Sequence, residues 1–160
     1  MKVNKEHRLE GARICDSPNF SDRLNEEISL LVIHNISLPP GQFGNNFVDQ
    51  FFTNKLDPKK DPYFEEIYEM KVSSHLFIDR EGLLTQFVPF DRAAWHAGVS
   101  KFKGRDNCNE FSIGIELEGT DDLEYPPNQY KTLIEATKAL MEAYPDISVD
   151  NIVGHKDIAP

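Results

Sequence analysis

The apolar run LLVI at residues 30–33 constrains the fold of this chain more than any other segment. Four consecutive apolar residues without alternation are typical of a strand that is buried on both faces, in the middle of a sheet. The run continues into His34 and Asn35, and Pro39-Pro40-Gly41 follows shortly after. We therefore expect a central strand that ends on a histidine, beside a loop that proline and glycine hold open.

The other patterned segments predict a mixed sheet with helices on its faces. Residues 111–118 alternate between apolar and polar or small side chains, as a strand does. Residues 126–144 carry an apolar stripe at helical spacing that includes Tyr130, Ile134 and Leu140. The further elements that we predict are helices at 43–53 and 63–68, strands at 72–78, 83–88 and 151–153, a hairpin turn at 79–82 and an aperiodic loop at 89–110. The fold class is thus α/β, with an N-terminal arm at 1–28 packed on a single domain at 29–160, whose mixed central β-sheet is flanked by helices.

Charge and composition exclude several classes of partner. The chain has 160 residues and a net charge of −10, which argues against a nucleic-acid partner and against docking on an anionic membrane. No apolar run is long enough to span a bilayer, and no apolar block follows the basic residues near the N-terminus. The two cysteines are too few for a disulfide framework. We expect a cytoplasmic protein with reduced thiols, acting as a monomer.

His34 and His155 share a local setting, because each follows a short apolar run. Ligands commonly bind at strand ends in α/β sheets, so two imidazoles from separate strands could meet at one metal ion. Zinc is the natural candidate, since it accepts neutral histidine and keeps an open position in catalytic sites. The alternative is that each histidine only caps its strand with a hydrogen bond. The pattern alone leaves both interpretations open.

Two glutamates lie on the polar face of the strand at 111–118. A carboxylate in a half-buried strand is costly unless it is paired or used, and one use is as a general base for a metal-activated water. Glu116 and Glu118 lie on the same face, so the pattern cannot choose between them. The alternative is a solvated face on which both acids are exposed.

The aperiodic loop holds the only tryptophan of the chain, Trp95, next to His96. A loop tryptophan could stack on a sugar or another flat apolar surface, although it could equally anchor the loop in the core. His75 lies within a strand-like segment. We interpret His75 as a buried histidine with a satisfied hydrogen bond.

Several motifs of the chain resemble those of a known family. The resemblance is carried by the motifs LLVIHNISLPPGQFG, VSSHLFIDREG, AAWHAGVS, CNEFSIGIELEGTD and GHKDIAP, which follow one another between positions 30 and 160. They are similar to those of the zinc-dependent N-acetylmuramoyl-L-alanine amidases of the peptidoglycan-recognition-protein fold. The similarity is greatest to the cytosolic branch that acts on 1,6-anhydromuropeptides in cell-wall recycling. The resemblance implies a hydrolase of a C–N amide bond, with Zn²⁺ as cofactor and a muropeptide as substrate.

The resemblance also implies roles for individual residues. His34 and His155 match two histidine ligands of zinc, and Glu116 matches the catalytic glutamate, in preference to Glu118. Asn35, Trp95 and His96 fall where the family lines the muropeptide pocket. In the implied mechanism, Glu116 takes a proton from a zinc-activated water, which attacks the bond between the muramyl lactyl group and L-alanine.

The sequence departs from the family at its C-terminal end and at the expected anion contacts. The family has a third zinc ligand, an aspartate, and a lysine several residues after GHKDIAP, but the sequence stops at Pro160. We expect that a C-terminal segment is missing; the alternatives are Asp157 as a substitute ligand, or a metal-poor module that binds muropeptide without cleaving it. Lys71 stands where we expect arginine, and Arg105 could compensate for Asn107, so we expect Lys71 and Arg105 to contact the substrate.

Overall fold

Strand β3 (Leu30–Ile36) lies inside a six-stranded sheet in the computed structural model, which describes residues 1–160. Its two neighbours, β9 (Ser112–Glu118) and β10 (Ile152–Gly154), both run parallel to it. β3 and β9 pair along their whole length, and this register places His34 opposite Glu116. The first three residues of β3 are fully buried, so the prediction of a central strand covered on both faces is confirmed.

The sheet is mixed, as predicted. The strand order is β1-β5-β4-β9-β3-β10. β4 (Leu76–Ile78) is parallel to β9, whereas β5 (Leu84–Gln86) returns antiparallel to β4 through the predicted hairpin turn. β1 (Arg13–Ile14) adds to the far edge, parallel to β5.

The remaining elements are short, apart from one helix. The predicted aperiodic loop at 89–110 contains strands of only two or three residues, which are too short to show a periodicity. The small strands are β2 (Phe20–Asp22), which pairs with β6 (Arg92–Ala94), and β7 (Lys101–Phe102), which pairs with β8 (Arg105–Asp106). The helices are α1 (Phe47–Phe52), α2 (Phe64–Ile67), α3 (Pro127–Ala143) and α4 (His155–Ile158), with 3₁₀ turns η1 (Cys108–Glu110) and η2 (Val149–Asn151). None of these helices has both the length and the apolar character that a membrane crossing requires.

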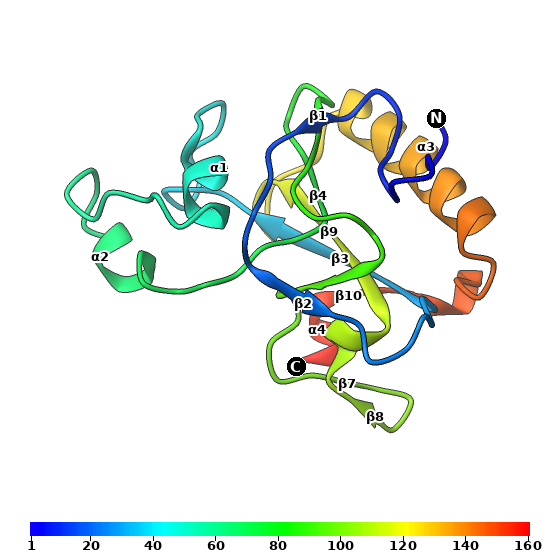
Figure 1. Ribbon diagram of the computed structural model, residues 1–160. Coiled ribbons are helices and arrows are strands. Elements are labelled where there is room, and N and C mark those ends of the chain that lie inside the picture. Colours follow the sequence, from blue (N-terminus) through cyan, green and yellow to red (C-terminus); the bar gives the residue numbers. More distant parts are fainter.

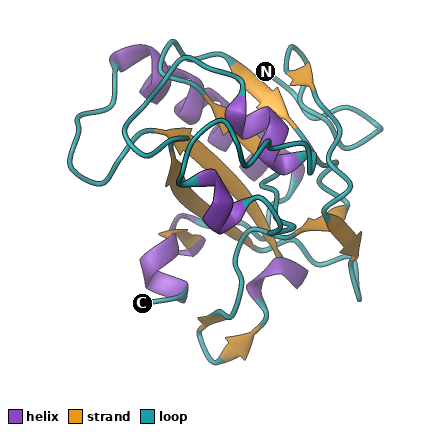
Figure 2. Cartoon of the chain, turned by 90° about the vertical axis from the view of Figure 1, so that its left-hand side faces the viewer, coloured by secondary structure: helices purple, strands orange, loops and turns teal.

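Helices cover the two faces of the sheet (Figure 1). α3 packs on one face through Ala136, Ala139 and Leu140, and α1 and α2 pack on the other through phenylalanine side chains. The stripe that we predicted for α3 is partly wrong, because Tyr130 and Ile134 are about half exposed. The buried face of α3 is centred on Ala136, Ala139 and Leu140, and Leu133 and Met141 pack at its edge. A quarter-turn of the molecule shows the N-terminus near the top and the C-terminus well apart from it, at the lower left (Figure 2).

The N-terminal segment is fixed to the domain by a buried arginine. The Arg23 guanidinium donates hydrogen bonds of 2.9–3.2 Å to the backbone carbonyls of Phe90, Asn109, Glu110 and Ser112. Burial is the largest cause of a pKa for Arg23 that is lowered to about 10. One side chain therefore joins the arm to the loop before β9 and to the start of β9.

Replacing Arg23 with methionine is expected to lower the free energy of unfolding by at least about 3 kcal/mol, because several buried carbonyls lose their donor together. The measurement is urea unfolding at pH 7. Arg92→Met is the matched control, since Arg92 forms an exposed ion pair with Asp22. That variant should change stability by less than about 1 kcal/mol. Equal losses in the two variants would contradict the role given to Arg23.

Candidate functional site

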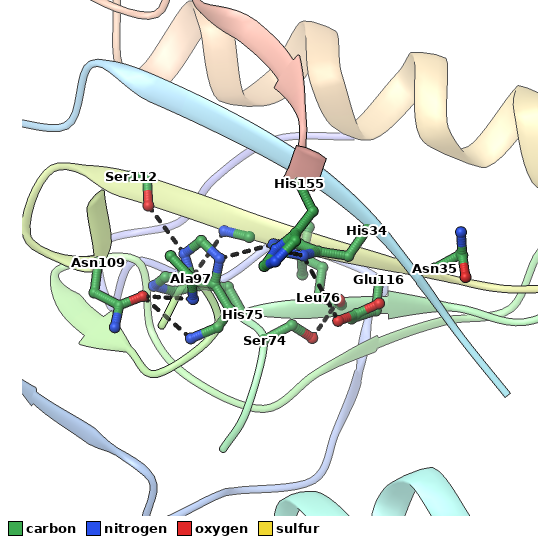
Figure 3. A network of polar contacts seen from close by, with 12 residues as sticks. His34, Asn35, Ser74, His75, Leu76, Ala97, Asn109, Ser112, Glu116 and His155 are labelled. Atoms are coloured by element: carbon green, nitrogen blue, oxygen red, sulfur yellow. Dashed lines mark hydrogen bonds and ion pairs between the residues drawn. The ribbon is translucent and has the colours of Figure 1, made fainter. Parts of the chain in front are cut away.

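Two histidine rings meet at the end of the central strand. β3 delivers His34, and β10 leads directly into His155, the first residue of α4. Gly154 is in register with Ile33. The residues that follow them, His155 and His34, therefore reach the same edge of the sheet. The two Nδ1 atoms lie 2.9 Å apart, and the side chains point toward one another (Figure 3). Burial, and secondarily His155, lowers the pKa of His34 to about 3, so His34 is neutral at physiological pH.

Glu116 lies beside this pair, on the adjacent strand. Its Oε1 is 4.0 Å from His34 Nδ1, while its Oε2 is buried and has no hydrogen-bond partner. Burial raises the pKa of Glu116 to about 8. A buried carboxyl oxygen without a partner is costly to the fold, and such groups cluster at functional sites. The geometry therefore makes Glu116 available for proton transfer.

Glu118 has a different environment from Glu116. It is only 3% exposed, and its two carboxylate oxygens accept hydrogen bonds from the backbone N–H groups of Gly44 and Arg80. Neither glutamate is on a solvated face, so that alternative is wrong. Glu118 joins two loops to β9, and its oxygens are already occupied.

A chain of hydrogen bonds continues from His34 into the protein interior. His34 Nε2 lies 2.9 Å from His96 Nδ1, and His96 Nε2 lies 2.9 Å from Ser112 Oγ. Figure 3 labels His34 and Ser112, the two ends of this chain. Burial, followed by the neighbouring charges, lowers the pKa of His96 well below its usual value. His75 bonds mainly to backbone: its Nδ1 accepts from the Gly114 N–H and its Nε2 lies 2.8 Å from the Arg92 carbonyl oxygen. The Arg23 guanidinium also lies 3.5 Å from His75 Nε2.

Two cavities, of about 550 and 820 Å³, meet at this site. They share four lining residues: Asn35, His96, Glu116 and Asp121. The smaller cavity extends toward α1 and α2 and has an apolar wall, to which Phe51, Tyr63, Ile67 and Trp95 contribute. The larger one holds His34 and His155. An extended ligand could therefore lie across Glu116 with one end in each cavity.

The predicted substrate-binding residues separate into two groups. Asn35 and Trp95 line the smaller cavity, where Asn35 donates to Asp121 and the Trp95 indole N–H lies 3.3 Å from Ser21 Oγ. Lys71 is exposed and Arg105 pairs with Glu27, and neither residue lines either of the two cavities. The Arg105 guanidinium also stacks on the Phe111 ring, 3.9 Å from its centroid. Both basic side chains thus lie outside the site.

Several residues of the site carry no signal in the sequence. The sequence predicts ordinary core positions for the apolar wall of the smaller cavity, because Phe51, Tyr63 and Ile67 lie in segments with helical spacing. Asp121 follows β9 in a polar loop and is recognisable only from its contact with Asn35 and its place in both cavities. Ser112 is hidden within the alternating strand.

The donor set at the site fits part of a zinc centre. His34 and His155 direct ring nitrogens to one point, and imidazole nitrogen is a common ligand of zinc. No group of three or more His, Cys, Asp or Glu side chains gathers in metal-binding geometry. Asp157 does not complete the pair, since its Oδ2 accepts the Gly154 N–H at 2.8 Å and caps α4. The structure therefore brings together two side chains that could serve as metal ligands, His34 and His155.

Comparisons with known proteins agree with this fold and site. The N-acetylmuramoyl-L-alanine amidase family matches residues 24–160, so the chain belongs to that family. The resemblance stated from the motifs and the prediction of an amide hydrolase are confirmed. The chain is 56% identical over 153 residues to the 1,6-anhydro-N-acetylmuramyl-L-alanine amidase AmpD of Haemophilus influenzae, covering 95% of this chain and 83% of that protein. The corresponding AmpD of Escherichia coli is 54% identical, with the same coverage of both chains.

Solved structures extend the similarity to three dimensions. A crystal structure of a selenomethionine derivative of AmpD superposes with a TM-score of 0.97 at 50% identity, covering 100% of this chain and 89% of the other. The predicted fold class is thereby confirmed. The amidase AmiD of E. coli, solved with the substrate anhydro-N-acetylmuramic acid-L-Ala-D-γ-Glu-L-Lys, superposes with a TM-score of 0.57 at 27% identity, covering 96% of this chain and 53% of that one.

Proposed function

We propose that this chain is a zinc amidase that cleaves the bond between the muramyl lactyl group and L-alanine in 1,6-anhydromuropeptides. The high identity to proteins named for that activity supports the substrate class. The observation that carries the proposal is the unpartnered Glu116 Oε2 beside two facing histidine nitrogens, at the junction of two cavities. A cytoplasmic location, implied by the motifs of the cytosolic branch, belongs to the same proposal.

Each residue has a part in the proposed reaction. His34 and His155 would hold zinc, which would supply Lewis acidity to a water molecule and to the scissile carbonyl. Glu116 Oε2 accepts a proton from the attacking water and then donates it to the leaving nitrogen of L-alanine. Burial raises the pKa of Glu116 to about 8, well above that of an ordinary carboxyl, which suits a group that both accepts and donates a proton. The two cavities orient the substrate across Glu116, which lines both of them.

Product analysis tests the proposed bond. The zinc-loaded protein is incubated with a 1,6-anhydro-N-acetylmuramyl tripeptide, and the products are identified by mass spectrometry. We expect the intact anhydro sugar acid and a free peptide that begins with L-alanine. The matched substrate with a reducing muramic acid measures how strongly the anhydro ring is required. Cleavage at another bond, or none with zinc present, would contradict the proposal.

The second candidate function is a muropeptide-binding module without catalysis. The observation that favours it is that only two metal-binding side chains gather at the site. A site with two protein ligands holds zinc weakly compared with the closed or three-ligand sites of zinc proteins. This candidate predicts saturable muropeptide binding with no peptide release at any zinc concentration.

Trp95→Ala is expected to weaken substrate binding about tenfold, because the indole provides flat apolar area on the wall of the smaller cavity. Calorimetric titration with anhydromuropeptide, using the Glu116→Gln protein to prevent turnover, gives the Kd. Trp95→Phe is the control that keeps an aromatic face, and it should bind within a few-fold of the parent. An unchanged Kd in Trp95→Ala would contradict a role for Trp95 in substrate binding.

A further inference from the structure

We propose that His96 is a positioning residue, which holds His34 in the tautomer that carries its proton on Nε2 and so turns the Nδ1 lone pair of His34 toward the metal position. This inference rests on the proposed function, because it takes His34 as a zinc ligand. It differs from the role in substrate binding that the motif AAWHAGVS predicts for His96.

The hydrogen bonds of His96 leave it no free polar atom. Its Nδ1 is 2.9 Å from His34 Nε2 and its Nε2 is 2.9 Å from Ser112 Oγ. A neutral imidazole has one donor and one acceptor, so both are used within the protein. A substrate group could bond to the His96 ring only by breaking one of these contacts. The His96 ring therefore lines the cavities but has no free nitrogen that could form a hydrogen bond with a substrate.

The polarity of this chain of hydrogen bonds decides whether His34 can bind a metal. In one direction, His34 Nε2–H donates to His96 Nδ1, and His96 Nε2–H donates to Ser112 Oγ. In the other direction, Ser112 donates to His96, His96 Nδ1–H donates to His34 Nε2, and His34 carries its proton on Nδ1. Only the first direction leaves a lone pair on the His34 nitrogen that faces His155. Partners that fix the tautomer in this way are general at histidine metal sites.

The surroundings hold the His96 ring in place. A Cβ atom added at Gly114 would lie 2.5 Å from His96 Cγ, so the ring occupies the space above a glycine of β9. The backbone N–H groups of His96 and Ala97 both donate to Asn109 Oδ1, at 3.2 and 2.9 Å. The ring is thus fixed from its backbone, from its face and at both nitrogens, as a positioning role requires.

The first test is the tautomer of His34 in the zinc-free protein at neutral pH. Long-range ¹H–¹⁵N NMR of labelled histidine identifies which ring nitrogen carries the proton. We expect His34 to be protonated on Nε2 in the wild-type protein. Protonation of His34 on Nδ1 would overturn the inference, and this result does not depend on whether any variant folds.

The second test is zinc affinity, measured by competition with a chromophoric chelator. His96→Leu removes the acceptor and is expected to lower the affinity 10- to 100-fold. His96→Asn keeps an acceptor at the position of Nδ1 and should restore most of it. Gly114→Ala should lower the affinity without removing any polar group, because its Cβ displaces the ring. His7→Asn, which removes a distant histidine at a positive φ that asparagine tolerates, should match the wild type.

The outcomes separate this inference from the proposed function. If His34→Ala does not weaken zinc binding, the proposed ligand set is wrong. If His34→Ala weakens binding but His96→Leu binds zinc as the wild type does, the ligand set stands and the role of His96 is overturned. Equal losses in His96→Leu and His96→Asn would also overturn it, because the acceptor at Nδ1 would then have no effect.

Discussion

Replacing Glu116 with glutamine is expected to lower kcat about 10²- to 10⁴-fold, the range that general acid–base catalysis contributes. Glutamine keeps the shape of the side chain but cannot take the proton from water or return it to the leaving amine. Zinc binding should persist, because Glu116 Oε1 lies 4.0 Å from His34 Nδ1 and serves no ligand role. The measurements are steady-state turnover of anhydromuropeptide and zinc content of the same preparation.

Glu118→Gln is the matched control for this prediction. It changes the same side chain two residues away on the same strand, where the carboxylate accepts the N–H groups of Gly44 and Arg80. We expect Glu118→Gln to lower the free energy of unfolding by about 1–3 kcal/mol and to leave kcat nearly unchanged below its melting temperature. Glu116→Gln should instead leave stability unchanged or higher, because the carboxyl that it removes is buried and unpartnered. Near-normal turnover in Glu116→Gln would contradict the catalytic role.

Removing one of the facing histidines is expected to have the second large effect. His155→Ala should lower zinc affinity more than about 100-fold. Loss of a residue that only hydrogen-bonds to a metal ligand already lowers metal affinity about 10- to 100-fold, and loss of the ligand itself should lower it further. Turnover should fall with zinc occupancy. His155 is exposed at the start of α4, so the zinc-free variant should melt within a degree or two of the zinc-free wild type. Zinc titration and thermal unfolding in the presence of a chelator separate these effects.

His75→Asn provides a comparison for His155→Ala. His75 is a buried histidine that bonds to the backbone at Gly114 and Arg92 and lies beside the Arg23 guanidinium. Its loss should lower stability rather than zinc affinity. If His155→Ala and His75→Asn had the same effect on zinc affinity, the assignment of His155 as a ligand would be wrong.

Much of the fold follows from local patterns in the sequence. The run at 30–33 predicts a central strand because no polar residue interrupts it, and the structure places that strand between two parallel neighbours. The alternating segment predicts β9, but the polar face of β9 is covered by loops and not by water. Alternation records side-chain polarity, and it does not record whether tertiary contacts bury the polar side. This is why Glu118 could not be distinguished from Glu116 by pattern.

The sequence predicts some residues of the site and not others, because only some of them lie in segments with a regular pattern. His34 and His155 stand out because each follows an apolar strand at the edge where ligands bind. The contact of His96 with His34 depends on a loop of short strands, whose path has no periodic signature. Gly114 looks like any small residue in a strand, and only its distance to the His96 ring shows why it has no side chain. Lys71 and Arg105 were predicted from positions where the resemblance implies basic residues, but a match of position and charge does not show which way a surface side chain is directed.

The most direct test of the central account is the zinc dependence of peptide release. The protein is stripped with a chelator, and release of the L-alanine peptide from 1,6-anhydromuropeptide is followed while zinc is restored in steps. We predict that release stops in the stripped protein and returns in proportion to bound zinc, reaching its maximum at about one ion per chain. Full release from the stripped protein, or no release at any zinc concentration, would contradict a zinc amidase built on His34, His155 and Glu116.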